Sequence, residues 1–182
     1  MNLAPHRLRR QASALLVIDF QERLFAAMEP HSRERTLKRT LAAIDGAKAL
    51  GLPVFATEQY PKGLGPTVAA IRERIAPPIE KLRFSAAGAV EGKLGGRTQV
   101  LLVGMETHVC VFQTARDLVE SGLEVYLCAD AVLSRTLEDR SIGLELARSA
   151  GAVLTTVEAA LFDLLGVAGT AEFKAVSAAV KG

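Results

Sequence analysis

The sequence has few cysteines and histidines, the residues on which disulfide frameworks and many metal sites depend. Its 182 residues include only two cysteines, Cys110 and Cys128, and three histidines, His6, His31 and His108. Two cysteines cannot build the disulfide framework of a small secreted protein, and the scattered histidines lack the paired spacing of metal ligands. We therefore expect reduced thiols and a cytoplasmic protein.

An excess of one charge and long apolar runs are also missing. Lys and Arg number 22 against 20 Asp and Glu, a net charge of +2 without a basic stripe, so we expect neither nucleic acid nor a membrane as partner. The longest apolar run, residues 14–18, stops at Asp19, well short of the roughly 18 residues of a membrane span. The basic opening segment lacks the apolar core of a secretory signal, so residues 1–11 are expected to be a flexible tail of a single domain over residues 1–182.

Short apolar runs alternate with longer alanine-rich segments of helical period, which predicts a parallel sheet wound through crossover helices. The expected strands span residues 13–20, 53–59, 79–85, 98–104, 123–130 and 151–156. The expected helices span residues 30–50, 110–121, 138–150, 156–165 and 170–181. Because ligands bind beyond the carboxyl ends of such strands, the polar residues at those ends are the candidate site.

Three polar residues near strand ends carry most of the chemical signal. Asp19 ends a buried strand, where an ionised carboxylate is paired, hydrogen-bonded or functional, or else caps the next loop. Lys81 could neutralise Asp19 or a developing oxyanion, or it could be a solvated edge lysine. Cys110 begins a helix, where the dipole and a nearby lysine favour the thiolate of a nucleophile, although buried cysteine is commonly inert packing, as we expect for Cys128.

Four separated segments resemble the isochorismatase-like cysteine hydrolases, a family that includes nicotinamidases and N-carbamoylsarcosine amidohydrolase. The segments are LLVIDFQERL (15–24), PVFATEQYPKGLG (53–65), EKLRFSA (80–86) and VLLVGMETHVCVFQTARDL (100–118). Within the family, TEQYPKGLG, GMETHVCV and TTVEAALFDLLG look most like the isochorismatase domain-containing proteins. The resemblance implies a three-layer, Rossmann-like α/β fold with six parallel strands in the order 3-2-1-4-5-6, helices on both faces, and a homo-oligomer.

The resemblance also implies a catalytic triad, in which Asp19 is the general base, Cys110 the nucleophile and Lys81 the cation that holds both. A non-proline cis peptide between Met105 and Glu106 would aim the Glu106 N–H, beside that of Cys110, into an oxyanion hole. The implied reaction is hydrolysis of a small amide, or of a related C–N bond, through a Cys110 thioester.

The segment after the second strand departs from the metal-binding members of the family. Nicotinamidases carry an Asp-x-His pair and a further His there, whereas this chain has no histidine between His31 and His108. We therefore expect no metal and no cofactor, an orienting role for Gln21, and a structural or rim role for His108. The side chains expected to contact a small-molecule substrate are Gln21, Phe25, Glu58, Tyr60, Phe84 and Thr107.

Two other functions stay open. Isochorismatase-type cleavage of a vinyl ether needs a carboxylic acid but no thiol, so Cys110 favours amide chemistry over it. A binding or interaction protein that keeps the fold with little turnover is the other alternative. For the implied homo-oligomer, the expected interface is the apolar C-terminal helical pair, with Ala159, Leu161, Leu164, Leu165 and Val167.

Overall fold

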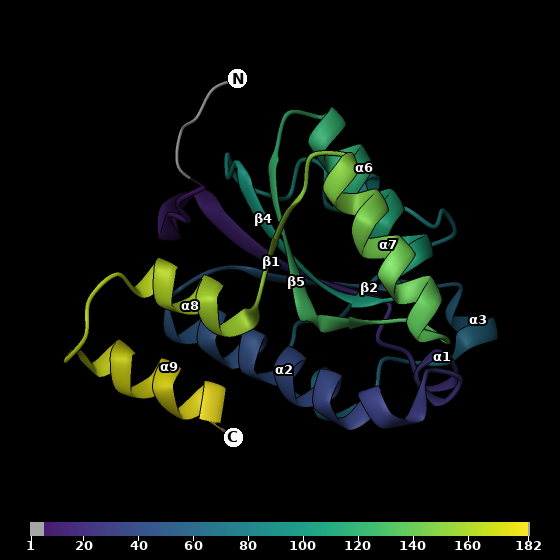
Figure 1. Cartoon of the computed structure of the whole chain (residues 1–182), viewed down its shortest axis with the longest axis horizontal. Coiled ribbons are helices and arrows are strands. Elements are labelled where there is room, and N and C mark those ends of the chain that lie inside the picture. The colour runs from purple at the N-terminus through teal and green to yellow at the C-terminus, as the bar shows by residue number, and fades with distance from the viewer. Residues whose placement is uncertain (1–5, 182) are drawn as a thin grey trace.

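The computed structural model describes residues 6–181 and contains one parallel sheet of six strands in the order β3-β2-β1-β4-β5-β6, as predicted (Figure 1). The strands are β1 (Ser13–Ile18), β2 (Val54–Gln59), β3 (Ile79–Lys81), β4 (Gln99–Met105), β5 (Glu124–Leu133) and β6 (Val153–Thr155). The central strands β1 and β4 are buried along their whole length. Apolar residues on both faces of these strands explain why the sheet needs a helical layer on each side.

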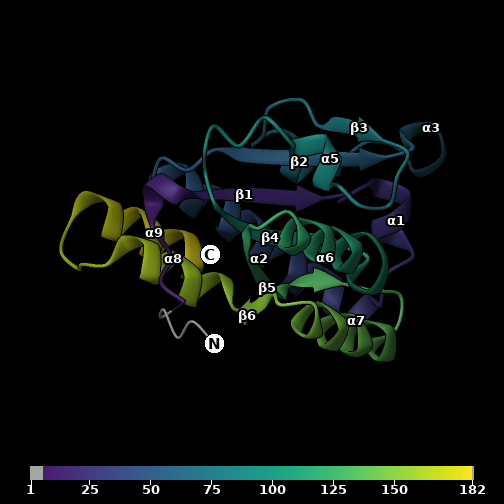
Figure 2. The same ribbon diagram turned by 90° about the horizontal axis from the view of Figure 1, so that it is seen from above.

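Helices cover both faces of the sheet, which confirms the three-layer prediction (Figures 1 and 2). The long helices are α2 (Pro30–Ala49), α6 (Phe112–Glu120), α7 (Leu137–Ser149), α8 (Val157–Leu165) and α9 (Ala171–Lys181). Short helical segments fill the connections: η1 (Arg10–Ala12), α1 (Glu22–Ala26), α3 (Pro61–Leu64), α4 (Ala69–Arg72), α5 (Ala87–Val90) and η2 (Thr107–Val111). Leu15 and Val17 face the layer of α2 and α8, whereas Leu16 and Ile18 face the layer of α6.

Three strands end two or more residues away from the predicted position. β1 stops at Ile18 because Asp19 adopts a left-handed conformation with φ of 50°. β3 stops at Lys81 rather than at residue 85. β5 continues to Leu133, past the predicted end at Asp130, because its register against β4 shifts between Leu102 and Gly104.

The segment expected to be a flexible tail is packed from Leu8 onward, so that expectation is wrong for this part, while residues 1–5 lie outside the described residues. The Leu8 N–H donates to the Asp163 carboxylate over 2.7 Å, and Arg10 Nε donates to the Leu164 carbonyl over 2.8 Å. These bonds place the segment against α8, because the guanidinium satisfies a carbonyl near the end of that helix.

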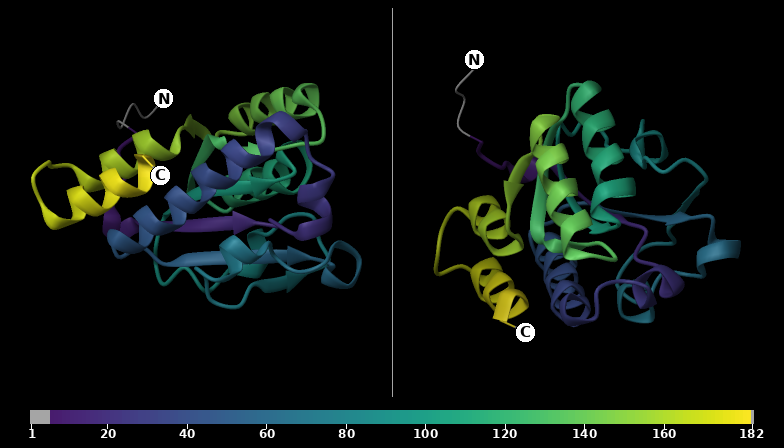
Figure 3. Two further views of the ribbon diagram at one scale, coloured as in Figure 1. Left: turned by 90° about the horizontal axis from the view of Figure 1, so that it is seen from below. Right: turned by 45° about the vertical axis from the view of Figure 1, so that its right-hand side comes forward.

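The leucines of α8 that were expected at an interface between copies are packed inside the fold. Leu161, Leu164 and Leu165 are 2–5% exposed and pack in the core with α2, beside which α8 and α9 lie (Figure 3). Only Val167 of the expected large side chains is open to solvent. Exposed large apolar side chains occur instead on α7 and near β3: Leu137, Ile142 and Leu146, and Tyr60, Leu82 and Phe84. None of the described helices combines the length and apolar character needed to cross a bilayer.

Candidate active site

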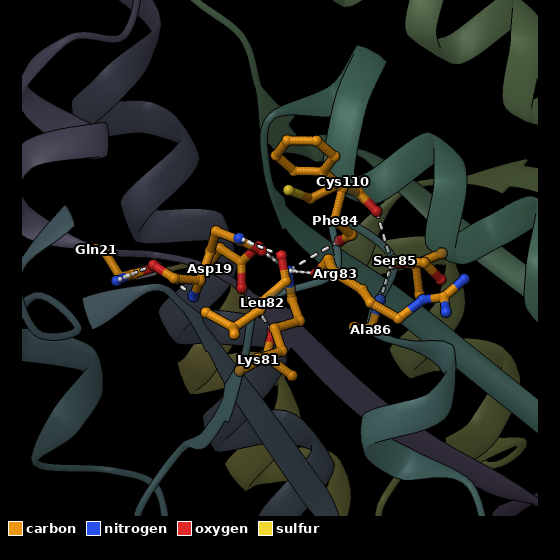
Figure 4. A network of polar contacts seen from close by, with 12 residues as sticks. Asp19, Gln21, Lys81, Leu82, Arg83, Phe84, Ser85, Ala86 and Cys110 are labelled. Carbon is orange, nitrogen blue, oxygen red and sulfur yellow. Dashed lines mark hydrogen bonds and ion pairs between the residues drawn. The ribbon is translucent and has the colours of Figure 1, made fainter. Parts of the chain in front are cut away.

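Asp19 and Lys81 form a buried ion pair at the carboxyl ends of β1 and β3 (Figure 4). Lys81 Nζ lies 2.6 Å from Asp19 Oδ2, and the two side chains are 5% and 0% exposed. Thr57, on the intervening strand β2, donates its hydroxyl to Asp19 Oδ1 over 2.8 Å. The carboxylate is therefore held at both oxygens, which fixes its orientation before any substrate binds.

The Lys81 ammonium makes all its bonds within the chain. Besides Asp19, it donates to Gln59 Oε1 and the Phe84 carbonyl over 2.8 Å each, and it lies 3.2 Å from the Arg83 carbonyl. An ammonium has only three N–H groups. Of the two roles expected for Lys81, the geometry therefore fits neutralisation of Asp19 and leaves no N–H for an oxyanion. These carbonyl bonds also turn the chain away from β3 after Lys81.

Gln59 is a site residue that the sequence reasoning missed, and Gln21 holds it. The Gln59 N–H donates to Gln21 Oε1 over 2.7 Å, and Gln21 Nε2 donates back to the Gln59 carbonyl over 3.0 Å. Gln59 Nε2 donates to the Leu82 carbonyl over 2.8 Å, while its oxygen accepts from Lys81. Gln21 thus holds Gln59 in place, and Gln59 in turn accepts a hydrogen bond from Lys81, which agrees with the orienting role expected of Gln21. No group of three or more His, Cys, Asp or Glu in residues 6–181 could hold a metal ion.

Cys110 lies in the π-helical turn η2, between β4 and α6, and is only 5% exposed. Burial, followed by the charge of Asp19, raises the pKa of the Cys110 thiol to about 12. Burial also raises the pKa of Asp19, against the opposing charge and hydrogen bond of Lys81. The proximity of the two side chains adds to the rise of the Cys110 pKa and opposes the rise of the Asp19 pKa. Desolvation therefore opposes the thiolate that a helix start favours, and it favours a proton on the sulfur beside the carboxylate.

The peptide bond between Met105 and Glu106 is cis, as predicted. It leads into η2, where the N–H groups of Val109 and Val111 both donate to the Glu106 carbonyl over 3.1 Å. The Glu106 carboxylate accepts from Arg135 Nε over 2.8 Å. The backbone around Cys110 therefore closes on the Glu106 carbonyl.

Helix α7 packs directly on this turn. A Cβ added at Gly143 would lie 2.6 Å from the His108 backbone nitrogen, so only glycine permits the contact. His108 Nδ1 lies 3.1 Å from the Ser134 hydroxyl, and His108 Nε2 lies 3.9 Å from Asp139. These contacts agree with the structural role expected of His108.

Two of the expected substrate contacts are engaged elsewhere. Glu58 Oε1 accepts from both the backbone N–H and the hydroxyl of Thr67, over 2.6 and 2.7 Å, so it fixes the loop before α4. Phe25 packs against Phe20 in the core on the α2 side, with ring centroids 5.5 Å apart. Thr67 therefore orients Glu58, and Phe20 orients Phe25. The sequence positions of the two residues do not reveal these partners.

The remaining expected contacts differ in their exposure. Tyr60 and Phe84 are about half exposed at the rim, together with Leu82, which is 77% exposed. Hollows of about 380 and 520 Å³ lie on either side of Leu82, and Lys81 borders both. Thr107 is fully buried, and its hydroxyl has no hydrogen-bond partner among residues 6–181.

The chain is similar in sequence to known proteins. Residues 13–159 match the isochorismatase domain. Isochorismatase domain-containing protein 2 of Bos taurus is 43% identical over 138 residues, which cover 74% of this chain and 68% of that protein. The secreted isochorismatase effector Isc1 of Phytophthora sojae is 40% identical, over 96% of this chain and 87% of its own.

Two solved structures share the fold. The MAR1 ribonuclease of Caenorhabditis elegans has a TM-score of 0.91 and 38% identity, with coverage of 97% of this chain and 93% of that one. The YcaC gene product of Escherichia coli, described as an octameric hydrolase of unknown specificity, has a TM-score of 0.84 and 26% identity, with coverage of 95% and 90%.

Proposed function

Because the chain belongs to the isochorismatase family, we propose that it is a metal-independent cysteine hydrolase that cleaves a small amide or related C–N bond through a thioester on Cys110. The observation that carries this proposal is a buried thiol whose pKa is raised by burial and by the charge of Asp19, with the Asp19 carboxylate held in place by Lys81 and Thr57. A nucleophile beside an oriented base is the arrangement that acyl transfer requires.

In the proposed mechanism Asp19 takes the thiol proton while the Cys110 sulfur attacks the substrate carbonyl carbon. The raised pKa of Asp19 makes it a stronger base than an exposed aspartate. As the tetrahedral intermediate collapses, the C–N bond breaks and Asp19 passes its proton to the departing nitrogen. A water molecule then gives a proton to Asp19 and attacks the thioester, which releases the acid and restores the thiol.

In this proposal, backbone N–H groups stabilise the negatively charged oxygen of the tetrahedral intermediate. All three N–H groups of Lys81 are occupied, so the side chain that carries positive charge cannot reach that oxygen. The N–H of Glu106, directly before η2, and that of Cys110, within η2, are the donors that we assign to the oxyanion.

We further propose that the chain acts as a single-domain, cytoplasmic homo-oligomer. The octameric YcaC relative supports assembly, and Leu137, Ile142 and Leu146 give α7 an exposed apolar face for it. Cys110 and Cys128 are both free and buried, which agrees with a reducing compartment. The Phytophthora relative is by its name secreted, so family membership alone does not decide the compartment of this chain.

Phosphodiester hydrolysis is a second candidate, which the likeness to the MAR1 ribonuclease favours. Cleavage of RNA needs donors for the phosphate oxygens, and Lys81 has none to spare. The site geometry therefore supports amide cleavage more directly.

A panel of small amides and imides, monitored for ammonia release, tests the proposal. We expect turnover by the wild type, and in Cys110→Ala a loss greater than the roughly 10²- to 10³-fold typical of removing one oxyanion donor. Cys128→Ala is the matched control, because that thiol is buried within β5 and should retain turnover. Full turnover in Cys110→Ala would refute the thioester, and cleavage of RNA without ammonia release would favour the second candidate.

A further inference from the structure

A positively charged groove runs along α2, between α9 at one end and the start of α7 at the other. It consists of two hollows of about 430 and 330 Å³ that share Arg35. Its charged side chains are Arg35, Lys38, Arg39, Arg140 and Lys181 against Glu34 and Asp130. Five cations and two acids give the groove a net charge of +3, whereas the whole chain carries +2. The residues outside the groove therefore sum to a net charge of −1 (+2 − 3).

The acid within the second hollow is already engaged. Asp130 Oδ2 lies 3.7 Å from Arg39 Nε, and Asp130 Oδ1 accepts from the Val157 N–H over 2.9 Å. Neither Arg35 nor Arg140 forms an ion pair within residues 6–181. Two guanidinium groups thus border the second hollow without a carboxylate in contact with either.

Arg140 is rigidly placed at the wall of this hollow. Its Nε donates to the Val132 carbonyl over 3.0 Å, and its Nη2 donates to the Ala129 carbonyl. Burial lowers the pKa of Arg140, and the charge of Arg35 lowers it further against the opposing charge of Asp130. Arg35 is therefore near enough to repel Arg140, and an anion between them would relieve that repulsion.

We propose that the groove binds a small phosphorylated molecule, with a phosphate group between Arg35 and Arg140. A guanidinium group can donate two parallel hydrogen bonds to the oxygens of a phosphate. The hydroxyls of Ser32 and Thr156, which line the same hollow, supply further donors. Lys38 and Lys181 in the adjoining hollow can take a second phosphate or a neighbouring anionic group. The proposal is independent of the chemistry at Cys110, because no residue of the triad lines the groove.

Thermal unfolding of the full chain in pyrophosphate and in inorganic phosphate, at constant ionic strength set with NaCl, tests the proposal. We expect a saturable rise in Tm with pyrophosphate, because a ligand that binds only the folded state stabilises it. Arg35→Gln should raise the apparent Kd roughly tenfold or more, since it removes a charge-assisted hydrogen bond. Arg148→Gln is the matched control, an exposed arginine on α7 outside the groove, and should leave the Kd unchanged.

A second variant, Arg140→Lys, keeps the charge but loses the planar fork, and it should weaken binding of pyrophosphate in the same direction. If its fold is lost with the carbonyl contacts, Arg35→Gln decides alone. An equal rise in Tm with NaCl only, or equal losses in Arg35→Gln and Arg148→Gln, would overturn the proposal. Binding of single-stranded RNA without any response to phosphate or pyrophosphate would also overturn it, in favour of a nucleic-acid surface.

Discussion

Replacing Lys81 by Met removes the positive partner of Asp19 while keeping most of the side-chain volume. The two charged groups are 2.6 Å apart and almost fully buried, so the variant leaves a buried carboxylate without a cation, while the Thr57 hydroxyl still donates to it. Breaking a buried ion pair in this way costs about 3–5 kcal/mol of unfolding free energy. We expect this loss at pH 8, where the carboxylate is ionised.

The loss should shrink as the pH falls. Burial already raises the pKa of Asp19, and Lys81 is the main group that opposes this rise, so its removal raises the pKa further. Between the unfolded value of 3.8 and the folded pKa, the folded state binds more protons than the unfolded state. Stability is therefore lost as pH rises through the folded pKa and regained as pH falls, by about 1.4 kcal/mol per pKa unit.

Urea denaturation at pH 5 and pH 8 measures the effect, with the wild type as reference at each pH. We expect a smaller deficit for Lys81→Met at pH 5, and recovery of part of the stability at pH 8 in the double variant Asp19→Asn/Lys81→Met, which buries no charge. Equal deficits at the two pH values would refute the reasoning, because they would show that Asp19 does not titrate with the missing partner.

Three further predictions concern the same site. Gly143→Ala should cost about 1–3 kcal/mol in urea denaturation, because its Cβ would lie 2.6 Å from backbone of η2, whereas Gly88→Ala, with no heavy atom within 4 Å, should be neutral or stabilising. Gln59→Leu removes an acceptor of the Lys81 ammonium and should lower kcat for amides more than it changes KM. Alkylation of Cys110 should keep accelerating above pH 9, since its pKa is about 12; a plateau near 8.5 would contradict this.

The strands could be predicted because each carries its own signal in the sequence, whereas their order followed from the family resemblance. The run from Ala14 to Ile18 is apolar on both faces, and burial of both faces is the condition for a central parallel strand. The strand ends could not be predicted, since distant partners set them. Lys81 ends β3 by bonding the Phe84 carbonyl, and Leu8 is ordered by Asp163.

The candidate site shows the same division between local and distant causes. The residues of the proposed triad were indicated by the order of the family's motifs, but the choice between Glu58 and Gln59 depends on strand register. Gln59 pairs with Lys81 across β2 and β3, whereas Glu58 pairs with Glu80. Because successive side chains point to opposite faces of a strand, only Gln59 shares a face with Lys81, and no count along one strand reveals this.

The resting state of Cys110 follows from a comparison of magnitudes. A helix dipole contributes typically 0.3–1 kcal/mol and favours thiolate, whereas the rise of the thiol pKa from 9.0 to about 12 corresponds to roughly 4 kcal/mol in the other direction. Desolvation, the largest cause of that rise, therefore decides the protonation state. In the proposed mechanism the Cys110 thiol therefore transfers its proton as it attacks, and Asp19 is the acceptor that we assign to it.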